Sequence, residues 1–233
     1  MPLLVVVPAL NEAESIHAVV EGARLVLGAP VVVVDDGSTD ATSDLARAAG
    51  ATVLPLPFNL GVGGAIRTGI HYAVDNGYRY VLQLDGDGQH EPTEAKRLLE
   101  ALDHDQADLV IGSRFASGYE VSRHRRAAMR VLSWVVSRRL RTRVTDTTSG
   151  FRAMGPRALE LFAREYPLDY LSDTVEALLL AADAGLRVIE VDVVMHTRQG
   201  GRPSANRMSS AFHLSRLLLV IVLHSLRRRT PPA

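Results

Sequence analysis

Two aspartates separated by one glycine, Asp85 and Asp87, follow a short apolar segment and give the sharpest chemical signal in the sequence. Side chains two positions apart in an extended segment point to the same side, so both carboxylates can reach one ligand. Gly86 lets the backbone bend closely around that ligand. Carboxylate oxygens suit Mg²⁺ or Mn²⁺, and Gln89 can add a neutral oxygen. The pattern predicts a metal site at Asp85, Asp87 and Gln89 that would stabilise a departing diphosphate.

A solvated acidic turn is the alternative interpretation of this spacing. The residues at two other predicted strand ends help to decide between a metal site and such a turn. Residues 8–12 (PALNE) and 35–38 (DDGS) also follow apolar segments. Ligands of open parallel α/β sheets bind beyond the carboxyl ends of the strands, so we expect these acids to share one ligand-binding edge. Asp36 can accept hydrogen bonds from a base or ribose, or act as an acid at a helix N-terminus. Asn11 and Glu12 carry the same alternative as helix-capping residues.

A glycine-rich segment, residues 59–64 (NLGVGG), opens a predicted helix. It is not a dinucleotide fingerprint, because Ile66 stands where the third glycine belongs and the segment does not follow the first strand. We interpret it as a tight turn whose backbone approaches a nucleotide, with a purely structural turn as the alternative. Gly63 and Arg67 are assigned to this nucleotide-sugar site.

The hydrophobic pattern alternates strands and helices through the first half of the chain, which predicts a Rossmann-like, mostly parallel α/β sheet with helices on both faces. The expected strands are 3–7, 31–34, 52–56, 80–84 and 109–111, and the expected helices are 12–27, 39–49, 63–75 and 92–102. Later we expect a loop at 113–122, helices at 124–141, 156–164 and 172–184, a short strand around Phe151, a strand at 187–194, a loop at 199–204 and an amphipathic C-terminal helix at 208–228. We divide the chain into a catalytic domain (1–207) and an apolar, basic C-terminal segment (208–233).

The amino-acid composition indicates which partners and which cellular location to expect. The formal net charge of the 233 residues is zero, so we do not expect nucleic acid as a partner. The absence of cysteine excludes disulfides and thiolate metal sites and suits the cytoplasm. No signal peptide is evident at the first residues, and no apolar run reaches the roughly 20 residues that span a bilayer.

One segment, residues 123–143, has eight arginines and no acidic residue. Apolar side chains recur in it at helical spacing around Trp134, which is typical of a helix on an anionic membrane surface. A helix packed on the core with a solvated arginine face is the alternative. The C-terminal segment can lie at the membrane interface, pack on the catalytic domain or bind a separate membrane protein. We therefore expect a peripheral protein at the cytoplasmic face of the membrane.

Six motifs in order resemble family 2 glycosyltransferases of the dolichyl- or polyprenyl-phosphate sugar synthase type, over about residues 3–205. They are residues 8–12 (PALNE), 34–40 (VDDGSTD), 59–61 (NLG), 85–90 (DGDGQH), 112–114 (GSR) and 146–152 (DTTSGFR). The resemblance implies a GT-A fold and an inverting transfer of a hexose from a UDP- or GDP-sugar to polyprenyl phosphate. Transfer to a hydroxyl group of a glycan, lipid or small molecule is the alternative.

The resemblance also assigns roles to residues. Those implied for the nucleotide sugar are Pro8, Ala9, Asn11, Glu12, Asp36, Asp85 and Gly86, and those implied for the acceptor are Ser149, Arg152 and Arg198. Arg114 is expected to meet a phosphate of donor or acceptor. Family members often continue with Arg-x-x-Gly-x-Ser-Lys; here Ser204 falls one place late and no lysine follows, which weakens the phosphate role of Arg198.

The acceptor decides the mechanism. A lipid phosphate is already ionised near neutral pH and needs no protein base, so catalysis would be positioning and electrostatic stabilisation. A hydroxyl acceptor needs a general base, for which Asp146 and Asp173 are the candidates, with a structural acid at a helix start as the alternative for Asp173. The residues assigned to catalysis are Asp87, Arg114 and Asp146.

Two other classes of protein fit less well. A nucleotidyltransferase also uses paired acids and a metal, but it usually needs a glycine-rich basic loop where residues 8–12 stand. A non-catalytic membrane-binding module would not need to keep Asp36, Asp85 and Asp87.

Overall fold

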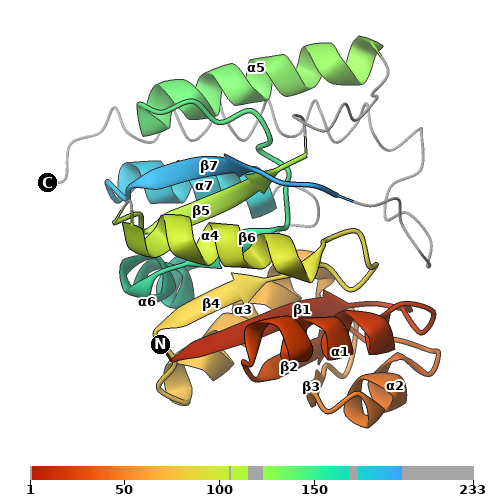
Figure 1. Cartoon of the computed structure of the whole chain (residues 1–233). Helices are drawn as coiled ribbons and strands as arrows, with labels where there is room; N and C mark the ends of the chain where they lie inside the picture. Colours follow the sequence, from red (N-terminus) through yellow and green to blue (C-terminus); the bar gives the residue numbers. More distant parts are fainter. Residues whose placement is uncertain (1, 105, 115–122, 168–172, 196–233) are drawn as a thin grey trace, which may run out of the picture. The chain divides into compact units, whose positions relative to one another are not determined.

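The computed structural model describes residues 2–104, 106–114, 123–167 and 173–195, and of residues 123–128 it describes the backbone alone. Its strands are β1 (Leu3–Ala9), β2 (Val31–Asp35), β3 (Thr52–Pro55), β4 (Tyr80–Gln83), β5 (Leu109–Ser113), β6 (Arg152–Met154) and β7 (Val188–Asp192). They form one sheet in the order β3-β2-β1-β4-β6-β5-β7 (Figure 1). The predicted loops at 113–122 and 199–204 and the C-terminal helix lie largely or wholly outside the described residues, as does the segment 208–233.

The sheet is mostly parallel, as predicted, with β6 as the exception. β6 runs antiparallel to both β4 and β5, whereas the other neighbouring strands pair in parallel. β1 and β2 are entirely buried, as expected for apolar strands covered on both faces. Their register places Ala9 beside Asp35, so the segments that follow these two strands begin next to each other.

Helices cover both faces of the sheet. They are α1 (Ile16–Leu27), α2 (Thr42–Ala48), α3 (Gly61–Asp75), α4 (Pro92–His104), α5 (Arg123–Leu140), α6 (Pro156–Glu165) and α7 (Asp173–Asp183). Buried residues of α1, α2 and α4 share one core with alternate residues of β1, such as Val5 and Val7. The opposite face meets α3, where a Cβ on Gly69 would lie 2.3 Å from Val6 Cγ1, so glycine permits this close packing. α6 and α7 contact α3, and α5 contacts α7.

Two helices begin later than the hydrophobic pattern predicted. α1 begins at Ile16 rather than Glu12, because the carbonyl of Glu12 accepts hydrogen bonds from the amides of Ser15 and Ile16 in a preceding turn. α2 begins at Thr42 rather than Thr39, where Asp40 Oδ1 accepts a hydrogen bond of 3.0 Å from the Thr42 amide. The Asp40 side chain acts before both helices, since its Oδ2 also accepts a hydrogen bond of 3.2 Å from the Ala13 amide ahead of α1. Within the described part of the chain, no helix combines the length and apolarity needed to cross a membrane.

Candidate active site

The segments after β1 and β2 are tied together by side-chain hydrogen bonds. Asn11 has a left-handed backbone (φ 55°), and its amide donates to Ser38 Oγ at 2.9 Å. Its Oδ1 accepts from the Thr39 amide at 2.8 Å. The amide of Glu12 donates to Thr42 Oγ1 at 2.9 Å. Pro8 and Ala9, at the end of β1, are buried beside this junction.

The aspartates at the end of β2 hold the backbone of neighbouring segments. Asp35 Oδ1 accepts from the Ser38 amide at 2.8 Å. Asp36 Oδ1 accepts from the Leu60 amide at 2.6 Å and its Oδ2 from the Gly61 amide at 2.9 Å, so this carboxylate binds the first turn of α3. Burial raises the pKa of Asp36 and the neighbouring Asp35 adds to the rise, while the two amides oppose it. Asp36 thus stabilises a helix N-terminus, although of a different helix from the one that follows it in sequence.

The Asp85–Gly86–Asp87 turn lies directly against the end of β1. A Cβ on Gly86 would lie 3.2 Å from the Pro8 carbonyl oxygen and 3.5 Å from Glu12 Cγ. The Gly86 carbonyl accepts a hydrogen bond of 2.7 Å from Ser15 Oγ. Glycine therefore lets the turn approach β1, a contact that was not predicted, and the structure brings the acids of three strand ends to one edge of the sheet.

Asp85 and Asp87 differ in their surroundings. Asp87 is buried, and its Oδ1 accepts from the Gln89 amide at 3.0 Å. The Asp85 side chain is 37% exposed, and its carboxylate rests on Gly150, where a Cβ would lie 2.4 Å from Oδ1. His90 Nδ1 accepts the Asp85 amide proton at 3.0 Å.

The metal site predicted from the sequence consists of Asp85, Asp87 and Gln89. Within the described ranges, no three histidine, aspartate or glutamate side chains gather closely enough to hold a metal by themselves. Asp85, Asp87 and Gln89 fit a hard cation that takes its remaining oxygens from water and a diphosphate, since Mg²⁺ commonly binds through one or two carboxylates. The exposed carboxylate of Asp85 is compatible with that arrangement.

Arg114 follows β5 directly and forms a bidentate ion pair with Asp146. Its Nε lies 2.8 Å from Asp146 Oδ2, and its Nη2 donates to Oδ1 at 3.2 Å and to Thr148 Oγ1 at 2.9 Å. The Asp146 side chain is wholly buried, whereas the Arg114 side chain is 16% exposed. Asp146 is in turn held through its amide by Glu190 of β7 at 3.1 Å.

Ser149 and Arg152, which follow Asp146 in the same segment, are joined by a hydrogen bond. Arg152 is completely buried; its Nε donates to the Ser149 carbonyl at 2.9 Å and its Nη2 to the Thr174 carbonyl at 3.0 Å. Asp173 is also buried, and burial raises its pKa to about 6, with Arg152 opposing the rise and Asp85 adding to it.

The remaining predicted residues lie on α3 or outside the described residues. Gly63 is buried in the first turn of α3, and Arg67 is partly exposed one turn later. Arg198 is not among the described residues. Ser15, His90 and Gly150 had no role predicted from the sequence, although His90 and Gly150 stand inside two of the motifs, residues 85–90 and 146–152.

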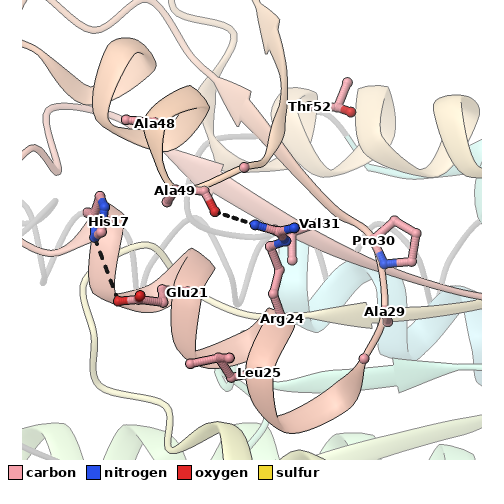
Figure 2. A pocket seen from close by; sticks show the side chains of 12 residues that line it. His17, Glu21, Arg24, Leu25, Ala29, Pro30, Val31, Ala48, Ala49 and Thr52 are labelled. Carbon is pink, nitrogen blue, oxygen red and sulfur yellow. Dashed lines mark hydrogen bonds and ion pairs between the residues drawn. The ribbon is translucent and has the colours of Figure 1, made fainter.

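A cavity of about 720 Å³ lies at the other end of the sheet, where β2 and β3 begin. Figure 2 shows its lining, in which Arg24 Nη1 of α1 donates to the Ala49 carbonyl at 2.7 Å. Glu21 and His17 lie one and two turns before Arg24 on the same helix. None of the acids at the carboxyl edge lines this cavity, so it is separate from the candidate active site.

A family model and two curated relatives match this chain over most of its length. The family model described as glycosyl transferase family 2 matches residues 4–163. The undecaprenyl-phosphate mannosyltransferase of Micrococcus luteus is 32% identical over 216 residues, 86% of each chain. The polyprenol monophosphomannose synthase of Mycolicibacterium smegmatis is 34% identical over 169 residues, 67% of this chain and 63% of that relative.

Solved structures confirm the predicted GT-A type of fold. The glucosyl-3-phosphoglycerate synthase of Mycobacterium tuberculosis, in complex with Mn²⁺, uridine diphosphate and glucosyl-3-phosphoglycerate, has a TM-score of 0.72 to this chain. The two share 22% sequence identity, over 99% of this chain and 81% of the other. At that identity the likeness concerns the fold.

Proposed function

The chain belongs to glycosyl transferase family 2, and we propose that it is an inverting enzyme that transfers a hexose from a UDP- or GDP-sugar to a polyprenyl phosphate. The observation that carries the proposal is the edge where the partly exposed Asp85 and the buried Asp87 follow β4 while Arg114 follows β5. An acidic pair for a metal-bound diphosphate and a fixed guanidinium for a phosphate are what this transfer needs. Two relatives whose names contain a polyprenyl-type acceptor support it.

The donor would lie along the edge formed by β1, β2 and α3. We assign Mg²⁺ or Mn²⁺ to Asp85, Asp87 and Gln89, where the cation supplies stabilisation of the leaving diphosphate. The residues that would bind the nucleotide sugar are Pro8, Ala9, Asn11, Glu12, Asp36, Gly63, Arg67, Asp85 and Gly86. The Asp36 carboxylate already accepts hydrogen bonds from two amides. It can accept a further one from the nucleotide, because each carboxylate oxygen can accept more than one hydrogen bond.

Asp146 serves this reaction by orienting Arg114. Both of its oxygens face the guanidinium and its side chain is wholly buried, so it is badly placed to take a proton from an acceptor. A bidentate pair fixes the plane of the guanidinium, which a phosphate contact requires. An acceptor that is already an anion makes a base unnecessary, which favours a lipid phosphate.

Three residues were predicted to bind the acceptor, and each is given a role here. Ser149 and Arg198 are proposed to contact the acceptor. Arg152 is proposed to position the Ser149 turn from below, because its guanidinium is wholly buried and donates to backbone carbonyls. Arg198 continues a motif from which the sequence departs at Ser204.

Transfer to a hydroxyl group is the second candidate, and Asp173 is the observation that favours it. Its pKa of about 6 suits a base near neutral pH, and Asp85 lies close enough to contribute to that value. Asp173→Asn would abolish transfer to a hydroxyl acceptor. Transfer to a lipid phosphate would keep most of its rate.

The outer face of α5 is proposed to rest on an anionic membrane surface. Val131 and Trp134 are 47% and 64% exposed, and Arg138 continues the same stripe at helical spacing. On the inner side of the helix, Arg139 pairs with Asp183 of α7 at 3.2 Å. An exposed tryptophan among arginines suits the lipid headgroup region. A cytoplasmic location and a separate membrane-protein partner remain predictions.

Co-sedimentation with anionic and with neutral vesicles tests this surface. Trp134→Ala is expected to weaken binding to anionic vesicles, while Phe58→Ala, which removes an equally exposed aromatic ring, leaves it unchanged. Equal binding by both variants and the unaltered protein would argue against a membrane role for α5.

The transfer itself is tested by the release of nucleoside diphosphate from UDP- and GDP-sugars. The assay contains Mg²⁺ or Mn²⁺, with or without polyprenyl phosphate in detergent. We expect turnover to require the lipid and to vanish in Asp87→Ala. Metal-dependent hydrolysis of the donor that ignores the lipid would redirect the search to another acceptor.

A further inference from the structure

His90 contacts both the backbone and the side chain of Asp85. Its Nδ1 lies 3.0 Å from the Asp85 amide, which donates to it. A ring nitrogen that accepts a hydrogen bond carries no proton, so the proton of the neutral imidazole is on Nε2. That Nε2 lies 3.5 Å from Asp85 Oδ2. The distance is too long for a strong hydrogen bond, so this second contact is an electrostatic one between the ring and the carboxylate.

The imidazole is held in this orientation by its surroundings. His90 is buried, and its ring stacks on Phe151 with centroids 4.7 Å apart and planes 14° apart. Phe151 is itself fixed, because its carbonyl accepts from the Gly112 amide at 2.8 Å and a Cβ on Gly112 would lie 2.9 Å from the ring.

The other side of the Asp85 carboxylate rests on the backbone. A Cβ on Gly150 would lie 2.4 Å from Oδ1 and 2.7 Å from Oδ2, so only glycine allows this approach. Gly150 and Phe151 are neighbours in sequence, and therefore one turn supplies both the floor under Asp85 and the ring that holds His90. The carboxylate has His90 on one side and Gly150 on another, and the Asp85 side chain is 37% exposed, which leaves room for a ligand.

We propose that His90 is a positioning residue: through its two contacts with Asp85 it fixes that carboxylate in the orientation that receives a divalent cation. This inference rests on the proposed function, since it assumes that Asp85 is a metal ligand. Groups that contact a metal ligand from behind set its orientation, and their removal typically weakens metal affinity 10- to 100-fold. His90 contributes as a neutral donor and acceptor, and its role requires no change of charge.

Three substitutions separate the contacts. His90→Phe keeps a flat ring that can stack on Phe151 but removes both polar contacts. His90→Asn can place an oxygen near the position of Nδ1 and accept the Asp85 amide proton. His90→Gln can place an amide nitrogen near the position of Nε2 and face the carboxylate.

The measurement is Mn²⁺ affinity in the presence of uridine diphosphate, by calorimetry and by the electron paramagnetic resonance signal of free Mn²⁺. We expect His90→Phe to bind Mn²⁺ about 10- to 100-fold more weakly, and His90→Asn to recover most of the loss. Circular dichroism confirms that each variant is folded. If His90→Phe does not fold, His90→Asn and His90→Gln carry the test, because each retains one contact.

Asp85→Asn is the reference that separates the two proposals. If Asp85→Asn loses Mn²⁺ while His90→Phe, or both single-contact variants, bind it as the unaltered protein does, the role of His90 is overturned and the metal site stands. If the unaltered protein binds no Mn²⁺ with uridine diphosphate, the metal site is overturned, and the role of His90 with it.

A metal-free measurement tests the geometry directly. The ¹⁵N spectrum of the histidine rings is expected to show His90 with Nε2 protonated and Nδ1 accepting a hydrogen bond. A proton on Nδ1 would overturn the inference whatever the binding data show, because that nitrogen could not then accept from the Asp85 amide.

Discussion

Two aspartates lie at the end of β2 and two follow β4, but only Asp85 of the four is substantially exposed, since Asp87 is buried and accepts a hydrogen bond from the Gln89 amide. Asp35 and Asp36 are 5% and 4% exposed, and their carboxylates accept hydrogen bonds from backbone amides of the residues 38, 60 and 61. At β4, the Asp85 side chain is 37% exposed and lies on a glycine. Acids at the same edge of the sheet therefore divide between holding loops and facing the space where a ligand can bind. The role of each aspartate therefore depends on whether backbone amides lie close enough to donate hydrogen bonds to its carboxylate.

Asp85→Asn gives the largest expected effect. If the Asp85 carboxylate faces a metal-bound diphosphate, its neutralisation should lower kcat about 10²- to 10³-fold, the range found when one electrostatic contact to a transition state is removed. The thermal midpoint should not fall, since Asp85 is partly exposed and its charge adds to the raised pKa of Asp173, which is an unfavourable interaction between the two acids. Initial rates and thermal unfolding measure the two quantities.

Asp108→Asn is the matched control for that variant. Asp108 lies at the opposite end of the sheet, where its Oδ2 binds Arg157 Nη1 at 2.9 Å and the Arg187 amide at 2.8 Å. It should lose about 1–2 kcal/mol of stability and keep its kcat. The reverse pattern in the two variants would show that Asp85 holds the structure and does not act in the reaction.

Asp173 should make stability depend on pH. Burial raises its pKa from 3.8 to about 6, so the folded state holds the proton more tightly than the unfolded state. The contribution of this group to the free energy of unfolding is therefore full below pH 3.8 and falls as the pH rises through about 6. A pKa change of that size corresponds to about 3 kcal/mol.

The check is urea unfolding of Asp173→Asn and of the unaltered protein across this pH range. As the pH rises, the free energy of unfolding of the unaltered protein should fall relative to that of Asp173→Asn, which has no carboxylate to ionise at this position. Asp103→Asn, on the exposed side of α4, serves as the control and should follow the unaltered protein. Parallel curves for all three would mean that Asp173 has the same proton affinity in both states.

Gly150→Ala should disturb Asp85 without touching any charge. The new Cβ would lie 2.4 Å from Asp85 Oδ1, so the carboxylate or the turn must move. We expect kcat to fall about 10- to 100-fold, as for the loss of other groups that orient a metal ligand. Gly155→Ala is the control at the other end of β6, because its nearest contact would be an ordinary 3.5 Å. Equal kcat values in both variants would contradict the described position of Asp85.

The sequence predicted the sheet well, because its main signals are local. The runs Leu3–Ala9 and Val31–Asp35 are apolar on both faces and are buried strands in the structure. The antiparallel direction of β6 was not predicted, since three residues carry no periodic pattern and their direction depends on pairing with β4 and β5. The starts of α1 and α2 were placed early because side-chain hydrogen bonds, such as that of Asp40, compete with the helix.

Site residues were harder to assign, because their roles depend on partners far away in sequence. That Asp36 would bind amides 24 and 25 positions later cannot be seen in a motif. The same holds for Arg114 and Asp146, which pair across 32 positions. Both were singled out as catalytic residues, but the ion pair between them was not foreseen. Gly150 was quoted in a motif, yet only the three-dimensional structure shows that it faces Asp85.

Asp36→Asn is the subtlest test of the difference between the two strand ends. An asparagine has one acceptor oxygen, so one of its two contacts with the first turn of α3 would be lost: either that to the Leu60 amide or that to the Gly61 amide, which also donates to Asn59 Oδ1. A hydrogen bond to a charged group contributes about 1.5–3 kcal/mol, but the raised pKa shows that burial of the charge offsets part of this. We therefore expect a net loss of about 1 kcal/mol in urea unfolding, with Asp44→Asn on the exposed face of α2 unchanged.

The kinetic signature of Asp36→Asn should also differ from that of Asp85→Asn. A shifted start of α3 weakens donor binding in the ground state and the transition state alike, so KM for the nucleotide sugar should rise about tenfold while kcat stays nearly constant. Asp85→Asn should lower kcat instead. If Asp36→Asn lowers kcat as strongly as Asp85→Asn and leaves KM unchanged, then both aspartates act on the leaving diphosphate, and the contrast in exposure between the ends of β2 and β4 does not reflect a division of roles.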